Sequence, residues 1–104
     1  MTLEHPEAEE IRLEDVLHAL SDPQRLRIVR ALGDSEDPMP CMAMKLGVTK
    51  STASHHFRIL REAGVIRQEK CGTSKMTTLR RDDLDDRFPG LLGAVLTADS
   101  LAAA

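Results

Sequence analysis

The chain has 104 residues, contains no Trp or Tyr and two Phe, and carries a formal net charge of −3 at pH 7. A chain of this length forms one small domain, whose core must be built from aliphatic side chains. It lacks the apolar run of about 18 residues that a transmembrane helix needs, and its acidic start is unlike a signal peptide. We therefore expect a cytoplasmic protein. Two cysteines are too few for a disulfide framework or a four-cysteine zinc site.

Positive and negative charges are sorted along the chain. Nine Lys or Arg side chains and two Glu side chains lie between residues 45 and 81, whereas both flanking segments are acidic. A basic surface on an acidic body is typical of a protein that lies against phosphates. The whole-chain pI of about 5.8 would argue against nucleic acid, but the local charge balance is more informative. The other interpretation of this basic stretch is the solvated face of a protein-interaction module.

The first twenty residues predict an arm followed by a helix. Residues 1–10 are polar and lack periodicity, so we expect a flexible acidic arm that becomes helical near Glu9. From Ile11 onward, apolar side chains recur at the spacing of one helix face. This stripe consists of Leu13, Val16, Leu17 and Leu20. The folded domain is expected to span residues 11–100, with a short tail at 101–104.

A second helix is predicted directly after this one. Asp22 can cap its N-terminus, and Pro23 suits its first turn, where no amide hydrogen is needed. Gly33 is expected to end the helix in a left-handed conformation. The two prolines within residues 34–40 then predict a loop. Residues 41–46 are long enough for a short helix after it.

The next segment predicts a longer helix. After a turn at residues 47–48, Thr49 or Ser51 can cap a helix that runs to about Ala63. Gly64 then closes this helix. Because a short helix, a turn and a longer helix follow one another, the order indicates a helix-turn-helix.

A β-hairpin and two further helical segments complete the chain. Residues 65–71 and 75–80 have strand-like composition and flank Gly72-Thr73-Ser74, which favours a hairpin turn. Asp82 and Asp83 place negative charge where the next helix begins. After Pro89 and Gly90 comes a last apolar stripe, formed by Leu91, Leu92, Val95 and Leu96. The expected fold class is mainly α with a small β-hairpin wing, a winged helix-turn-helix.

This arrangement suits double-stranded DNA. The second helix of such a motif enters the major groove with its N-terminus first, so that small hydroxyl residues and free amides meet phosphates and base edges. The hairpin tip can reach the adjacent minor groove or its phosphates. The predicted DNA contacts are Lys45, Thr49, Lys50, Ser51, Thr52, Ser54, His55, His56, Arg58, Thr73 and Lys75.

At these residues the chain resembles the ArsR/SmtB family of small winged-helix repressors. The matching segments are LSDPQRLRIVRAL, KLGVTKSTASHHFRILREAGVI and the hairpin ending in LRRDDL, and the resemblance covers about Leu13 to Leu84. It implies a homodimer in which the first and last helices pair, and an inverted-repeat operator with recognition helices about one DNA turn apart. The predicted dimer interface consists of the two apolar stripes: Leu13, Val16, Leu17, Leu20, Leu91, Leu92, Val95 and Leu96.

The chain departs from the family at its usual metal sites. Many metal-sensing members carry a C-x-C pair at the start of the short helix, where this chain has Pro38 and Pro40 followed by Cys41. Another group uses Asp and His residues along the last helix, but no His follows His56 here. We therefore expect neither of these two sites.

Two unusual sensing sites remain open as alternatives. His5 and His18, with the glutamates of the arm, are candidate ligands for a divalent metal such as nickel or zinc. Cys41 and Cys71 are candidates for a redox pair, although no sequence rule brings them within disulfide distance.

The sequence therefore predicts a homodimeric transcription regulator that represses by occupying a palindromic promoter site. One alternative is a DNA-binding subunit whose sensing is done by a partner protein. An alternative of another class is a protein-interaction winged helix. No phosphate-binding loop, nucleophile elbow or HExxH motif is present, and the chain is too short to enclose a substrate pocket, so we do not expect an enzyme.

Overall fold

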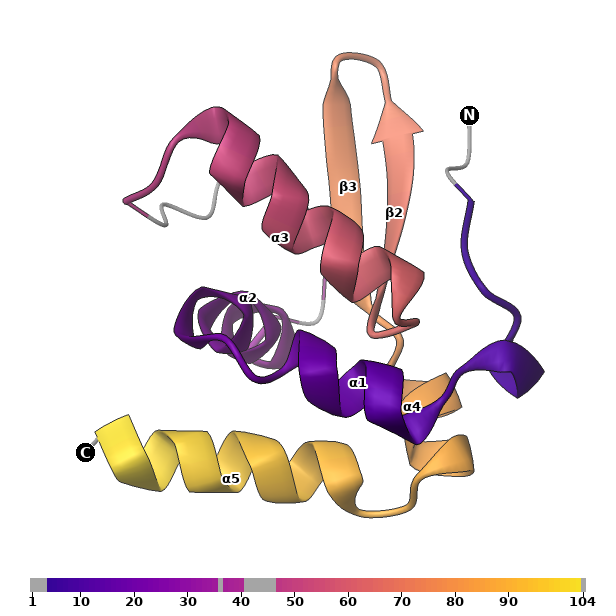
Figure 1. Ribbon diagram of the computed structural model, residues 1–104. Coiled ribbons are helices and arrows are strands. Elements are labelled where there is room, and N and C mark those ends of the chain that lie inside the picture. Colours follow the sequence, from indigo (N-terminus) through magenta and orange to yellow (C-terminus); the bar gives the residue numbers. More distant parts are fainter. Residues whose placement is uncertain (1–3, 36, 41–46, 104) are drawn as a thin grey trace.

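The computed structural model describes residues 4–35, 37–40 and 47–103 (Figure 1). The helices form a body from which the β-hairpin projects as a wing, with one helix lying beside it. This order confirms the predicted fold, mainly helical with a β-hairpin. The predicted short helix at 41–46 lies outside the described residues. The elements are η1 (Ala8–Glu10), α1 (Leu13–Ala19), α2 (Pro23–Gly33), β1 (Met39–Pro40), α3 (Lys50–Glu62), β2 (Ile66–Cys71), β3 (Ser74–Leu79), α4 (Arg81–Arg87) and α5 (Leu91–Ala103).

Helix α2 begins as predicted and ends differently. Asp22 Oδ1 accepts hydrogen bonds from the amides of Gln24 at 2.8 Å and Arg25 at 3.3 Å, which satisfies two of the amides at the helix start. Gly33, however, is the last helical residue and not a left-handed cap. A Cβ at this position would lie 3.2 Å from Leu96 Cδ1. The glycine therefore allows α5 to approach α2 closely.

Gly64 ends α3 in the predicted left-handed conformation, with φ of +85°. Its role extends beyond the turn, because a Cβ at this position would lie 2.5 Å from Ile11 Cγ1. Ile11 itself is buried in the core. The absence of a side chain at Gly64 thus lets the segment before α1 pack against the end of α3.

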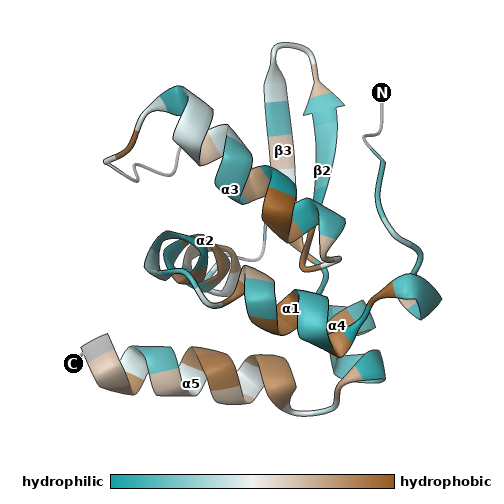
Figure 2. Cartoon of the chain, viewed as in Figure 1, coloured by the Kyte–Doolittle hydropathy of each residue, from teal (hydrophilic) through white to brown (hydrophobic). Residues whose placement is uncertain are grey.

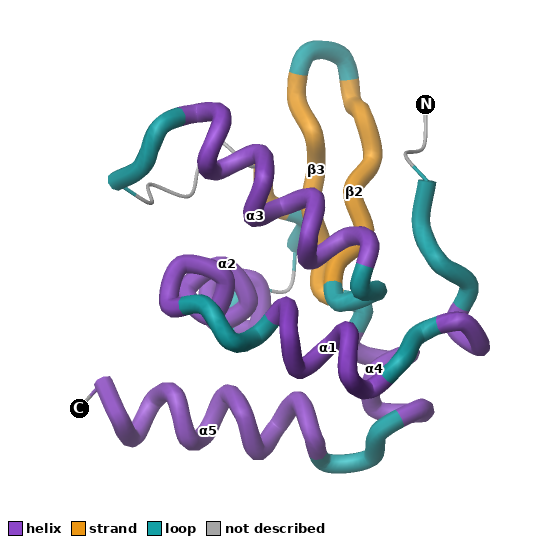
Figure 3. The backbone as a smooth tube through the Cα atoms, viewed as in Figure 1, coloured by secondary structure: helices purple, strands orange, loops and turns teal. Residues whose placement is uncertain are grey.

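The wing is an antiparallel hairpin with one additional strand. β2 and β3 pair from Ile66 opposite Leu79 to Cys71 opposite Ser74, and Gly72 has a φ of +64° in the turn (Figure 3). The predicted hairpin is confirmed. β1 adds a third strand on the other side of β3, with Met39 opposite Thr77. Sequence reasoning gave this segment as a loop, because a two-residue strand that contains Pro40 has no period-2 pattern.

Aliphatic side chains and Phe57 form the core between the helices and the base of the wing. Three residues of the predicted dimer interface belong to this core: Val16, Leu20 and Leu92 are 1%, 7% and 2% exposed. The prediction was wrong for them, because helical spacing identifies an apolar face but not the neighbour that covers it. Leu13 and Leu17, at 42% and 48%, are exposed. Leu91, Val95 and Leu96 are partly buried against the core.

Part of the predicted flexible acidic arm at residues 1–10, together with Ile11, is hydrogen-bonded to the rest of the domain. His5 Nε2 accepts a 2.9 Å hydrogen bond from the amide of Gln68. The Pro6 carbonyl accepts one from Arg80 at 2.8 Å, and the Ile11 carbonyl accepts one from Arg87 at 2.7 Å. These donors lie more than 60 positions along the chain, so local composition could not indicate them.

The longest helices of the described residues are α3 and α5, with 13 residues each. None of the described helices combines the length and the apolar character that a bilayer span requires.

Candidate nucleic-acid interface

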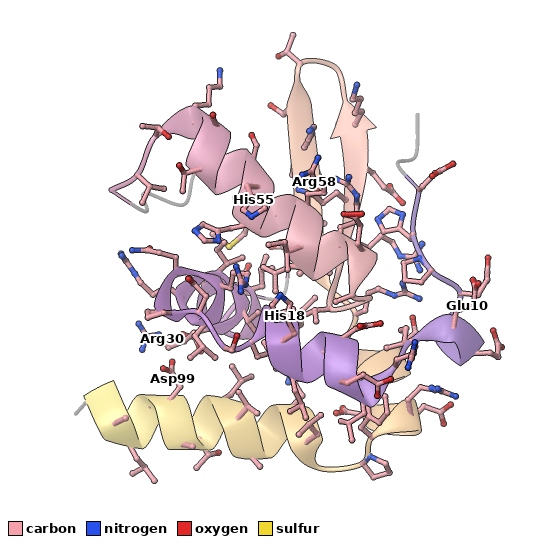
Figure 4. All side chains as sticks on the ribbon, viewed as in Figure 1. Glu10, His18, Arg30, His55, Arg58 and Asp99 are labelled. Carbon is pink, nitrogen blue, oxygen red and sulfur yellow. The ribbon has the colours of Figure 1, made fainter. Side chains whose placement is uncertain are left out.

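The first turns of α3 present a polar, basic face. Thr49 caps the helix by accepting a 3.2 Å hydrogen bond from the Thr52 amide, as the sequence predicted for this position. The start of the helix is exposed, and the positive end of the helix dipole there favours an anion. The exposed predicted contacts on this helix are Lys50, Ser51, Thr52, Ser54, His55 and Arg58, and the last two are labelled in Figure 4.

The turn of the wing lies at the same end of the molecule as the start of α3 (Figure 1). Thr73 and Lys75 are both exposed there. Side chains from the two elements face a common groove, with Lys50 and Ser54 on one side and Thr73 and Lys75 on the other. The structure therefore brings these predicted contacts onto one face, although they are more than twenty positions apart in the sequence.

His56 is the predicted DNA contact that the structure contradicts. Its side chain is 8% exposed, and its Nδ1 lies 3.2 Å from Nη1 of Arg25 in α2. Because a guanidinium only donates, the imidazole accepts through Nδ1 and keeps its proton on Nε2. The prediction failed because successive helical residues are rotated by about 100°, so the neighbour of an exposed His55 can face the core.

Arg25 is buried, and each of its three guanidinium nitrogens has a hydrogen-bond partner. Its Nε donates to the Ala19 carbonyl at 2.6 Å and its Nη2 to the His18 carbonyl at 3.3 Å. Both carbonyls lie near the end of α1, where helical carbonyls lack partners within the helix. Arg25 thus joins three helices, α1, α2 and α3, and fixes the back of the helix that carries the polar face. Sequence reasoning did not select it, since arginine is usually exposed.

A buried polar chain connects α3 with the wing. Arg61 Nη1 donates to Gln68 Oε1 at 2.8 Å, and Gln68 Nε2 donates to Thr77 Oγ1 at 3.3 Å. Gln68 is 1% exposed and Thr77 is fully buried. These contacts hold the two elements at a fixed angle. The available sequence signal was weak: Gln68 alternates with Ile66 on the inward face of the predicted strand.

The charge on this face is predominantly positive. On the described part of α3 and the wing, the carboxylates are those of Glu62 and Glu69. Glu62 lies 3.7 Å from Arg58 across one helical turn, and both side chains are more than half exposed. Such an exposed pair adds little stability. The surface is therefore suited to contact with phosphates.

Comparisons with known proteins agree with this geometry. A helix-turn-helix domain family matches residues 20–69. The chain is 39% identical over 79 residues to the HTH-type transcriptional regulator YceK of Bacillus subtilis, covering 74% of this chain and 79% of that protein. It is 33% identical over 61 residues to the SmtB homolog of Synechocystis, a transcriptional repressor, covering 59% of this chain and 46% of the relative.

The chain belongs to the ArsR/SmtB family of winged helix-turn-helix transcriptional regulators. Its fold is also that of the repressor BigR from Xylella fastidiosa, with a TM-score of 0.63 and 22% identity over 83% of this chain and 84% of the other. This ArsR/SmtB-family protein is therefore a DNA-binding regulator. Its relatives are named as transcriptional regulators, which agrees with the expectation that the chain is not an enzyme.

The two candidate metal ligands, His5 and His18, are not brought together in the described part of the chain. His5 uses Nε2 to accept a backbone hydrogen bond, while His18 is exposed on α1 (Figure 4). Across the described ranges, no three His, Cys, Asp or Glu side chains are grouped as a metal would require. Cys71 is an exposed thiol at the end of β2. Cys41 and the predicted DNA contact Lys45 lie outside the described residues.

Proposed function

We propose that the protein is a cytoplasmic homodimeric repressor that binds an inverted repeat in promoter DNA. The observation that carries this proposal is the common basic face of α3 and the wing, with Lys50 and Lys75 on opposite sides of one groove. On duplex DNA, the start of α3 would enter the major groove while the wing tip meets the adjacent backbone. Occupation of the promoter would repress by excluding other proteins from it.

Exposed leucines support the homodimer. Leu13 and Leu17 are the large exposed apolar residues of α1, and Leu101 near the end of α5 is 72% exposed. Figure 2 shows apolar residues along most of α5. Pairing these helices with those of a second copy would cover the leucines and place two α3 helices about 34 Å apart, one turn of DNA.

The signal that relieves repression would differ from that of the metal-sensing relatives. The proposed regulator lacks the C-x-C pair and the histidines of the last helix, as its sequence indicates. Nickel or zinc would then act at most through an unusual site. Sensing by a partner protein remains compatible with this proposal.

The proposal is tested by selecting bound duplexes from a random-sequence library and measuring their affinity by fluorescence anisotropy. We expect an enriched inverted repeat with half-site centres about 10 base pairs apart. Affinity should fall steeply with salt, and Lys50→Ala should reduce the slope of log affinity against log salt by about 1. The control is Arg12→Ala, which removes an exposed cation near α1. Absence of any enriched sequence, together with a flat salt response, would refute the proposal.

A further inference from the structure

The groove between α3 and the wing has a volume of about 410 Å³. This lies within the range of small-molecule sites, which are usually apolar hollows with a few placed polar groups. Its walls belong to two elements that the Arg61 to Gln68 hydrogen bond holds together. The groove is therefore a feature of the packed domain and not of a single loop.

The lining of the groove combines an apolar floor with a cationic rim. The partly exposed Ala53 of α3 and Pro40 of β1, with the edge of the buried Phe57, provide apolar surface. Lys50, Arg61 and Lys75 provide three positive charges, and no carboxylate is among the described lining residues. This combination suits a molecule that carries a negative charge on an apolar body.

Arg61 has a side-chain donor that lacks a hydrogen-bond acceptor. Its Nη1 donates to Gln68 Oε1 at 2.8 Å, but its buried Nε has no hydrogen-bond partner among the described atoms. Buried donors in folded proteins are nearly always paired. Because Nε is shielded from solvent, an oxygen of a bound anion would pair with it after a rotation of the Arg61 side chain toward the groove.

We propose that the groove binds a small organic anion, with a carboxylate, phosphate or sulfonate group at the cations and an apolar body over Ala53 and Phe57. A phosphate of the DNA backbone would meet the rim cations, but its neighbouring deoxyribose offers this floor less apolar surface than an aromatic or aliphatic body does. The ligand class is therefore an amphipathic anion. This assigns the regulator a sensing site that uses neither metal nor thiol.

Binding of this anion would compete directly with DNA, an inference that rests on the proposed function. Lys50, Ser54, Thr73 and Lys75 line the groove and are also predicted DNA contacts. One set of side chains cannot serve both partners at once. The coupling is reciprocal: bound DNA should lower the affinity for the anion by the same factor by which the bound anion lowers the affinity for DNA.

The probe for this site is 8-anilinonaphthalene-1-sulfonate, an amphipathic anion, and its neutral counterpart is N-phenyl-1-naphthylamine. Fluorescence titration of the full chain should give a saturable site for the anion. Lys75→Met should lower the affinity for the anionic probe about tenfold, because it removes a charged partner of the sulfonate. The affinity for the neutral probe should change by less than about twofold. Arg61→Met should act in the same direction, and circular dichroism checks that this variant remains folded.

Lys70→Met is the matched control, since Lys70 lies directly opposite Lys75 in the hairpin but is not part of the groove lining. It should change probe affinity less than twofold. Equal losses in the Lys70 and Lys75 variants, or equal affinity for the charged and neutral probes, would overturn the anion site. Random-sequence duplex at low salt should displace the anionic probe. If probe binding depends on Lys75 but duplex does not displace the probe, the proposed competition with DNA is wrong, whereas the proposed anion site is retained.

Discussion

Nη1 of Arg25 lies 3.2 Å from Nδ1 of His56, so that an arginine of α2 and a histidine of α3 are paired beneath the basic face. His55, the preceding residue, is exposed on that face. Two adjacent histidines therefore serve different purposes. His56 sets the position of the helix, and His55 is available to a partner.

Replacing the two histidines separately distinguishes these roles. His56→Ala removes the acceptor of a buried guanidinium and should lower the free energy of unfolding by about 1–3 kcal/mol. His55→Ala should change it by less than about 0.5 kcal/mol, as is usual at exposed sites, while weakening binding to the selected operator. Urea denaturation and anisotropy measure the two quantities. Equal stability losses in both variants would contradict the assigned orientation.

The proposed dimer depends on exposed leucines of α1. Leu17→Glu would place an unpaired carboxylate in an apolar interface, so we expect the dimer dissociation constant to rise at least about tenfold. Light scattering after size-exclusion chromatography measures the oligomeric state. Val48→Glu is the control, because Val48 is also exposed, at 38%, but lies before α3. A Leu17→Glu protein that remains dimeric at micromolar concentration would exclude α1 from the interface.

Two glycines with positive φ should respond differently to alanine. A Cβ added at Gly72 would have no atom within 4 Å. Gly72→Ala should therefore lower the free energy of unfolding only by the cost of a left-handed backbone at alanine, about 1–2 kcal/mol. Gly64→Ala adds a contact of 2.5 Å with buried Ile11 and should cost about 2–5 kcal/mol in total. Comparison of urea midpoints checks the difference. Equal costs would mean that Ile11 can move away from the new methyl group.

The cap of α2 predicts a specific acid dependence of stability. Burial raises the pKa of Asp22, but hydrogen bonds from the amides of Gln24 and Arg25, followed by the nearby Arg25 guanidinium, outweigh it and hold the pKa below its ordinary value. Since the folded state then favours the carboxylate more than the unfolded state does, this contribution is fully present at pH values above the ordinary titration range of an Asp carboxyl. It is lost as the pH falls through the folded-state pKa.

Asp22→Asn isolates this effect, because asparagine can cap the helix without titrating. The stability advantage of the wild type over this variant should be constant between about pH 5 and 7 and should shrink below about pH 4. Asp22→Ala should cost about 0.5–2 kcal/mol at pH 7 through loss of the cap. Urea denaturation across this pH range measures both differences. An advantage that stays constant down to pH 2.5 would show that Asp22 is not the titrating group.

The sequence by itself determined the features that depend on neighbouring residues. Thr49 and Asp22 could be assigned as caps because a cap bonds to amides two or three positions away. The hairpin followed from Gly72 between two strand-like runs, and the order of these elements indicated the winged helix-turn-helix. The concentration of basic residues on α3 and the wing was likewise a property of the sequence alone.

Tertiary structure decided which face of each element is covered and by what. The burial of His56, Val16 and Leu92, and the docking of His5 on the wing, depend on partners distant in the chain. Periodicity gives the angle between successive side chains but not the direction of the core, and a stripe of leucines fits a second copy as well as its own domain. The groove between α3 and the wing likewise could not be inferred from the sequence, because the angle between its walls depends on the tertiary hydrogen bond from Arg61 to Gln68.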